Sequence, residues 1–143
     1  MSKIAVVVDS TSDLPPTDRE RLGITVVPLN VHFGDEVFRD NVDISPTEFL
    51  ERLVTARQLP TTSQPSPALF EEAYRALAVN HDAIVAITLS AKLSGTFQSA
   101  NIAAEAVADT IRVEVIDSQM ASVALALQAI RPRGKLGGAV GRL

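Results

Sequence analysis

The sequence contains no cysteine and no tryptophan, and aromatic residues make up only 4% of its 143 residues. Without cysteine, disulfides, thiolate nucleophiles and thiolate metal ligands are excluded. The scarcity of aromatic rings argues against a platform on which nucleic-acid bases stack. No apolar run approaches the roughly 20 residues that a membrane-spanning helix needs, and the start, MSKIAVVVDS, lacks the pattern of a signal peptide. We therefore expect a cytoplasmic protein with no membrane span.

Acidic residues outnumber basic ones, and the formal net charge is −4. The imbalance lies in residues 1–130, which hold 9 Lys and Arg against 17 Asp and Glu, whereas residues 131–143 carry four bases and no acid. An acidic body argues against nucleic acid as a partner, because neutralisation of phosphates dominates such binding. Residues 131–143 also contain four of the seven glycines. We expect them to form a disordered tail after a single domain over residues 1–130.

Apolar runs rich in β-branched residues alternate with helical patterns along the chain. Strands are expected at residues 3–8, 24–33, 84–89 and 111–116, with a hairpin turn at Gly34-Asp35. Helices are expected after caps at Thr17 or Asp18, at Ser45 and at Ser66, and over residues 97–108 and 119–130. Residues 60–67 are expected to form a polar loop, and Pro28 marks an edge, a bulge or an entry point in its strand. The alternation predicts an α/β fold with a mainly parallel sheet flanked by helices.

Polar residues follow three of the expected strands. They are Asp9 with its neighbours, the turn from Ser90 to Thr96, and Asp117-Ser118. The carboxyl ends of parallel strands meet at one edge of the sheet, and ligands bind at that edge in α/β proteins. The sequence therefore predicts a binding site at this edge.

An acidic site and a purely structural role are both open for Asp9. With Thr11 and Asp13 close behind it, Asp9 would suit an Mg²⁺ or phosphotransfer site. The alternative is that Asp9, like Asp117, accepts backbone N–H bonds and caps its own loop. Because His32 lies in a strand pattern and His81 in a surface turn, structural or solvated roles are expected for both histidines. No catalytic residue, cofactor or metal site is expected.

Hydroxyl groups recur in two segments of the chain. One segment contains Thr61, Thr62 and Ser63, and the other contains Ser90, Ser94 and Thr96. Hydroxyls and free backbone N–H groups at a helix start suit a carboxylate or a phosphate. Ordinary helix capping by Ser94 or Thr96 is the alternative. The lone Gly95 matches no nucleotide-binding loop.

Four ordered motifs carry a resemblance over roughly residues 3–128: DSTSDLP, PTTSQPSP, LSAKLSGTFQSA and VEVIDSQMAS, with VPLNVHFGDEVFRDNVDIS between the first two. They resemble the DegV family of bacterial fatty-acid-binding proteins. The resemblance implies two α/β-type domains with a long-chain acyl group buried between them. By position, it implies a site for the fatty acid carboxylate at Thr62, Ser63 and Ser94, with Gly95 and Thr96 shaping the turn. It also implies a non-catalytic subunit that presents the carboxylate to a fatty acid kinase partner.

The chain departs from the family pattern in its length, since members are about twice as long as these 143 residues. We therefore expect that the second domain is absent and that residues 131–143 lie outside the family. A tunnel that has lost one wall exposes apolar surface, which favours self-association. Each acyl CH₂ left unburied forfeits roughly 0.8 kcal/mol. We expect truncation to impair lipid binding, with a non-functional remnant or Asp9-centred Mg²⁺ chemistry as the alternatives.

Overall fold

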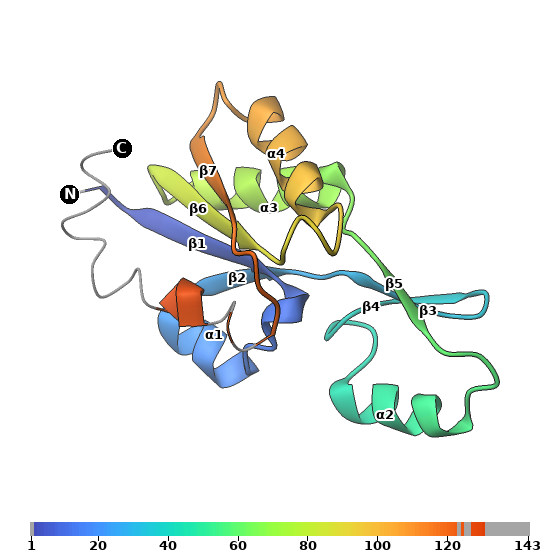
Figure 1. Ribbon diagram of the computed structural model, residues 1–143. Helices are drawn as coiled ribbons and strands as arrows, with labels where there is room; N and C mark the ends of the chain where they lie inside the picture. Colours follow the sequence, from blue (N-terminus) through green and yellow to red (C-terminus); the bar gives the residue numbers. More distant parts are fainter. Residues whose placement is uncertain (1, 123, 125–126, 131–143) are drawn as a thin grey trace.

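The strands divide between two sheets in the computed structural model (Figure 1). The structure describes residues 2–122, 124 and 127–130. The elements, in chain order, are β1 Ile4–Asp9, η1 Ser10–Ser12, α1 Pro16–Leu22, β2 Ile24–Val27, β3 Asn30–Phe33, β4 Glu36–Arg39, α2 Pro46–Thr55, β5 Thr61–Ser63, α3 Pro67–Ala78, β6 Ala83–Thr88, α4 Thr96–Ala106 and β7 Arg112–Asp117. Among the described residues, none of the helices combines the length and apolar character that crossing a bilayer requires.

The larger sheet has four strands in the order β2-β1-β6-β7, and every neighbouring pair is parallel. β1 lies in the centre, with Val6 paired to Ile24 on one side and to Val85 on the other. Parallel neighbours need long crossover connections, which the helices provide. The α/β fold with a mainly parallel sheet flanked by helices is confirmed.

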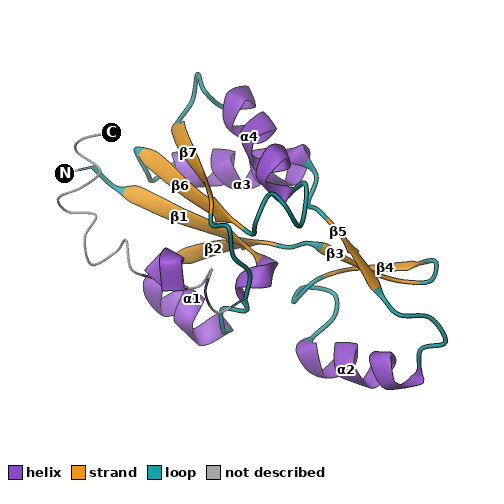
Figure 2. Cartoon of the chain, viewed as in Figure 1, coloured by secondary structure: helices purple, strands orange, loops and turns teal. Residues whose placement is uncertain are grey.

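Each face of this sheet is buried by helical residues, and β1 alternates between the two cores. Ala5 and Val7 join a core with residues of α3 and α4, including the fully buried Phe70 and Tyr74. Val6 and Val8 join a second core on the opposite face, which Ala129 completes. Figure 2 shows α3 and α4 on one side of the sheet and α1 on the other. Two-sided burial explains why β1 is a continuous apolar run.

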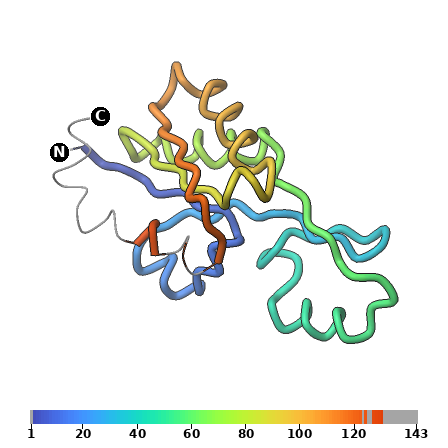
Figure 3. Tube along the Cα trace, viewed as in Figure 1, coloured from blue at the N-terminus to red at the C-terminus, as the bar shows by residue number. Residues whose placement is uncertain are grey.

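The smaller sheet is antiparallel, in the order β4-β3-β5. β3 and β4 form the hairpin expected at Gly34-Asp35, and α2 packs beside them through aromatic contacts of Phe33. The guanidinium of Arg52 on α2 lies 4.6 Å from the ring centroid of Phe38. The chain leaves the parallel sheet after β2, forms this unit and returns through β5 to α3 (Figure 3).

Two of the expected elements are wrong in this region. Residues 24–33 are not one strand, because Pro28 has no N–H for a ladder and separates β2 from β3, which belong to different sheets. The loop expected at residues 60–67 contains β5, which pairs with β3. The short segment has few β-branched apolar residues, so only its long-range partner reveals it as a strand.

The helix starts are partly as expected. Ser45 and Glu48 form a reciprocal capping box at α2, and Ser66 caps α3 ahead of Pro67. Capping of α1 by Thr17 or Asp18 is wrong, because the helix begins one turn earlier, after Pro15, with no side-chain cap.

The helix expected over residues 119–130 is also wrong at its start. Residues 119–122 form a turn, with Gln119 and Ser122 at positive φ, whereas residues 124 and 127–130 are helical. Asp117 accepts a hydrogen bond from Gln119 N at 2.9 Å, which ends β7 in this turn. The tail expected at residues 131–143 lies outside the described residues.

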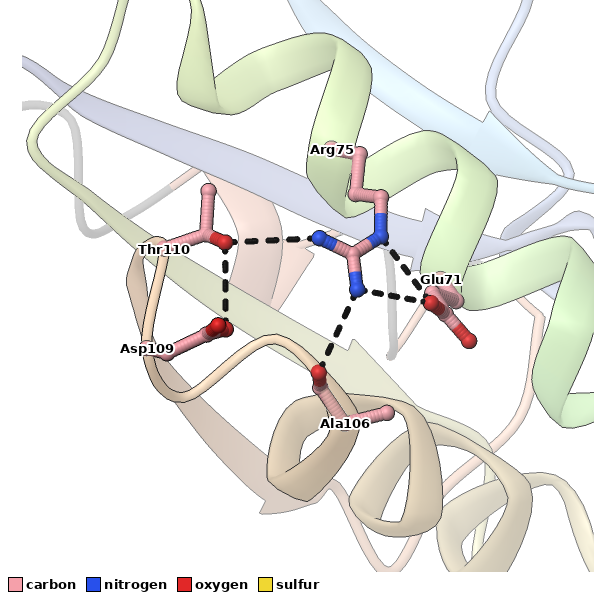
Figure 4. Close-up of polar contacts among 5 residues, drawn as sticks. All are labelled: Glu71, Arg75, Ala106, Asp109 and Thr110. Atoms are coloured by element: carbon pink, nitrogen blue, oxygen red, sulfur yellow. Dashed lines mark hydrogen bonds and ion pairs between the residues drawn. The ribbon is translucent and has the colours of Figure 1, made fainter.

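Arg75 joins α3 to the end of α4 (Figure 4). Its guanidinium pairs with Glu71 on its own helix and donates to the carbonyl of Ala106 and the hydroxyl of Thr110, each at 3.3 Å. A cation at the carboxyl end of a helix satisfies free carbonyls and complements the helix dipole. Arg75 therefore fixes α4 from the end opposite to its amino terminus.

Replacing Arg75 by methionine keeps most of the apolar stem but removes these bonds. We expect the free energy of unfolding, measured by urea denaturation, to fall by about 1–2 kcal/mol. Arg21→Met is the matched control, because among the described residues Arg21 forms an ion pair with Asp18 alone, on its own helix; it should change stability by less than about 0.5 kcal/mol. Equal losses in the two variants would contradict the role of the bonds to α4.

The exposed pair between Arg39 and Asp43 gives a pH signature. Hydrogen bonds from the Arg39 side chain and backbone lower the pKa of Asp43 from 3.8 to about 2. The folded state therefore favours the ionised form of Asp43. Its contribution to the free energy of unfolding is present above pH 3.8 and is lost as the pH falls towards 2. The difference in unfolding free energy between wild type and Asp43→Asn should be constant above about pH 5 and should shrink between pH 4 and 2. A difference that stays constant down to pH 2 would contradict this assignment.

Candidate functional site

Asp9 ties the end of β1 to the turn that follows β6. Its carboxylate is fully buried and accepts hydrogen bonds from Leu89 N at 2.7 Å, from Thr11 N at 2.9 Å and from the Thr11 hydroxyl. Burial raises the pKa of Asp9, while the hydrogen bonds from Thr11 and Leu89 oppose that shift. The expected structural role of Asp9, as an acceptor that caps its own loop, is confirmed.

The other side of the same turn is held by the end of β7. Ser90 N donates to the carbonyl of Met120 at 2.9 Å, and Ala91 N donates to the carboxylate of Asp117 at 3.2 Å. The expected role of Asp117 as an acceptor of backbone N–H bonds is confirmed too. The residues after β1, β6 and β7 therefore meet at one edge, as their order in the sequence predicted.

Ser94, Gly95 and Thr96 form the junction between this turn and α4. The hydroxyls of Ser94 and Thr96 are 2.9 Å apart, and Ser94 Oγ also accepts from Thr96 N at 3.3 Å. Thr96 is fully buried, whereas Ser94 is only partly buried. Ser94 is therefore the more accessible of the two hydroxyl groups. Gly95 is the N-cap of α4 and makes no side-chain cap, so the N–H groups that follow that of Thr96 have no capping acceptor from Gly95.

The segment from Thr61 to Gln64 lies against this junction through one contact. The amide of Gln64 packs on Gly95, where a methyl group would lie only 2.7 Å from Nε2. This contact brings together two segments that are separate in the sequence. The order of the motifs gave no signal for it, because it depends on how β5 enters the smaller sheet.

Thr62 and Ser63 point to opposite faces of the smaller sheet, because successive residues of a strand alternate. Ser63 lies opposite Asn30, and its hydroxyl is 2.8 Å from Nε2 of His32. Thr62 lies opposite Val31 and is exposed, and its hydroxyl forms no hydrogen bond with any of the described residues. His32, expected to be structural, thus contacts an expected site residue that is one strand away.

An open cavity of about 490 Å³ lies beside Ser63. Its walls include Ser66 at the start of α3, Ser99 in the first turn of α4 and the side chain of Arg39. The Arg39 guanidinium forms a two-pronged pair with Asp43, with both distances 2.8 Å, so its charge is already matched. Arg39 therefore brings no unmatched positive charge to the wall of this cavity.

The acidic alternative finds no support in the geometry. Both carboxylate oxygens of Asp9 accept hydrogen bonds from N–H or O–H groups, and these donors occupy the positions that a cation would need. Within the part of the chain that the structure describes, no group of three His, Cys, Asp or Glu side chains is placed to hold a metal ion. The arrangement instead offers hydroxyl and N–H donors, which suit an anion.

A parallel sheet with a hydroxyl-bearing turn at its carboxyl edge, leading into a helix amino terminus, defines an α/β protein of the kind whose ligands bind at this edge. The model of the DegV family matches residues 3–133, and the chain belongs to this family. The match extends three residues beyond the boundary expected at residue 130.

Relatives and solved structures agree with this membership. A DegV domain-containing protein of Deinococcus radiodurans is 40% identical over 128 residues, covering 90% of this chain and 45% of that protein. The structure of DegV, a fatty acid binding protein from Bacillus subtilis, superposes with a TM-score of 0.91 at 34% identity, covering 98% of this chain and 49% of that one. The structure of a DegV family protein from Thermus thermophilus, described for its fatty acid binding, superposes with a TM-score of 0.85 at 41% identity. The match covers 96% of this chain and 48% of that one. The chain spans about half the length of the relatives it matches.

Removing the Asp9 carboxylate tests its role as the tie between β1 and the turn. In Asp9→Ala the N–H groups of Leu89 and Thr11 lose their acceptor, and we expect unfolding free energy to fall by about 2 kcal/mol. Urea denaturation followed by circular dichroism measures this. Asp35→Ala, an exposed change in the hairpin turn, is the control and should stay within about 0.5 kcal/mol of wild type. An Asp9 variant as stable as the control would overturn the assignment.

Proposed function

We propose that the chain binds the carboxylate of a long-chain fatty acid at the carboxyl edge of its parallel sheet. The observation that carries this proposal is the Ser94–Thr96 pair at the start of α4, in a chain whose solved relatives are fatty acid binding proteins. When the Thr96 hydroxyl and N–H both donate to Ser94 Oγ, the Ser94 proton is free for the ligand. A chain of such bonds polarises the terminal donor and strengthens it.

Thr62 is the second direct donor in this proposal. One carboxylate contacts only one of Thr62 and Ser63 directly, because the two side chains lie on opposite faces of β5. The Ser63 hydroxyl is engaged with His32, whereas the Thr62 hydroxyl is without a hydrogen bond among the described residues. Ser63 then orders β5 through His32. Gly95 and Thr96 shape the turn, as the motif implies.

The acyl chain needs apolar surface, and half-length coverage of the relatives limits what this chain supplies. Near the turn, Leu93 is 70% exposed and Met120 is 46% exposed. Each CH₂ group of the acyl chain that is left in water lowers the binding free energy by roughly 0.8 kcal/mol. We therefore propose weak binding by this chain alone, and self-association through the same exposed apolar side chains.

In the cell, this activity would be that of a cytoplasmic binding subunit and not that of an enzyme. A carboxylate held by neutral donors at an exposed edge is accessible to a second protein. A fatty acid kinase is the partner that the motif resemblance implies. Such a subunit contributes the ligand and its orientation, and the partner contributes the catalytic groups.

Titration of ¹⁵N-labelled protein with decanoate, followed by NMR, tests the binding function. We expect saturable shifts at residues 90–98 and at Thr62. Losing one hydrogen bond to a charged ligand costs roughly 1.5–3 kcal/mol. Ser94→Ala and Thr62→Val should therefore each weaken binding about tenfold or more, whereas Ser63→Ala should change it less than threefold.

Two results would contradict this function. A wild-type protein that shows no shifts at millimolar decanoate is a remnant without lipid binding. Binding that survives in the Ser94→Ala/Thr62→Val double variant lies at another site. In both cases unchanged spectra of the unliganded variants establish that the fold is intact.

A further inference from the structure

The backbone conformation of Gly95 does not require glycine, but the amide of Gln64 lies where a side chain would be. Its φ of −76° and ψ of 8° are open to any residue. A methyl group at this position would lie 2.7 Å from Nε2, 3.0 Å from Cδ and 3.2 Å from Oε1 of Gln64. Contacts this short are well inside van der Waals separation. The missing side chain therefore makes room for one particular group, the flat amide of Gln64.

The Gln64 amide lies against Gly95. The residue is exposed, and its side chain forms no hydrogen bond with any of the described residues. Ordering a glutamine side chain costs conformational entropy, and its amide carries two N–H donors that prefer a partner. The amide also lies over the N-cap of α4, beside the helix start where an anion is favoured. The two N–H donors of Gln64 are therefore available to an anion that binds beside the helix start.

We propose that Gln64 is a further ligand-binding residue that donates its amide N–H to the carboxylate held by Ser94, and that the absence of a side chain at Gly95 lets the amide lie there. This inference rests on the proposed function. The donors are then a hydroxyl, an amide and backbone N–H groups, all of them neutral. Such a set gains most from a ligand that is itself charged, so Gln64 selects a carboxylate over an uncharged head group.

Introducing a negative charge at residue 64 tests this role. Gln64→Glu has nearly the same shape but replaces a donor by an acceptor-only carboxylate, and decanoate should bind at least tenfold more weakly than to wild type. Binding of 1-decanol, the neutral homologue, should change less than threefold. Gln58→Glu adds the same charge in an exposed segment away from the turn and is the matched control, with decanoate affinity within threefold of wild type.

A double-mutant cycle tests the role of Gly95. Gly95→Ala pushes the amide away while leaving Gln64 in the sequence, so it should weaken decanoate binding about as much as Gln64→Ala. The Gln64→Ala/Gly95→Ala variant should be no weaker than either single variant, because both remove the same contact. Thermal unfolding should show Gly95→Ala partly rescued by Gln64→Ala.

The outcomes distinguish the role of Gln64 from the proposed fatty acid binding itself. If wild type binds decanoate and Ser94→Ala loses it, but Gln64→Glu binds as wild type does, the role of Gln64 is overturned and the carboxylate site stands. If wild type does not bind decanoate, both proposals fall. Equal weakening of decanoate and 1-decanol by Gln64→Glu also overturns the role, because it indicates a structural effect in place of a donor.

Discussion

One buried carboxylate holds the edge of this protein together. Asp9 sits at the end of the central strand and receives N–H groups from its own loop and from the turn after β6. A charge without solvent is costly unless donors surround it, so the arrangement is stable only when both loops are in place. The bond from Leu89 N to Asp9 fixes the start of the turn that leads into α4.

The remaining contacts extend this constraint outward. Asp117 and the carbonyl of Met120 hold the turn from the β7 side, and the Gln64–Gly95 contact joins it to the smaller sheet. At the far end of α4, Arg75 donates to the carbonyl of Ala106. The helix is therefore held at both ends by groups from other elements. Preorganisation of this kind allows neutral donors to bind an anion without rearrangement.

The sequence allowed the sheet, its parallel direction and the meeting of the segments after β1, β6 and β7 at one edge to be predicted, because β-branched runs and the caps at Ser45 and Ser66 are local signals. The division at Pro28, the strand β5 and the turn at residues 119–122 were not predictable in the same way. β5 depends on β3, which lies far along the chain. The division at Pro28 and the turn held by Asp117 instead depend on local features within otherwise continuous strand and helix patterns. Gln64 lay inside a recognised motif, but only its position over Gly95 gives it a distinct role.

The bond between Asp9 and Leu89 joins residues 80 positions apart. Closing so large a loop costs chain entropy before any contact compensates for it. Local elements, namely α3, β6, α4 and β7, can assemble first, and β1 joins them late. Because β1 contributes residues to both hydrophobic cores, its docking completes the cores and the carboxyl edge of the sheet in one step. Any molecule that binds only at the completed edge would stabilise the native state alone.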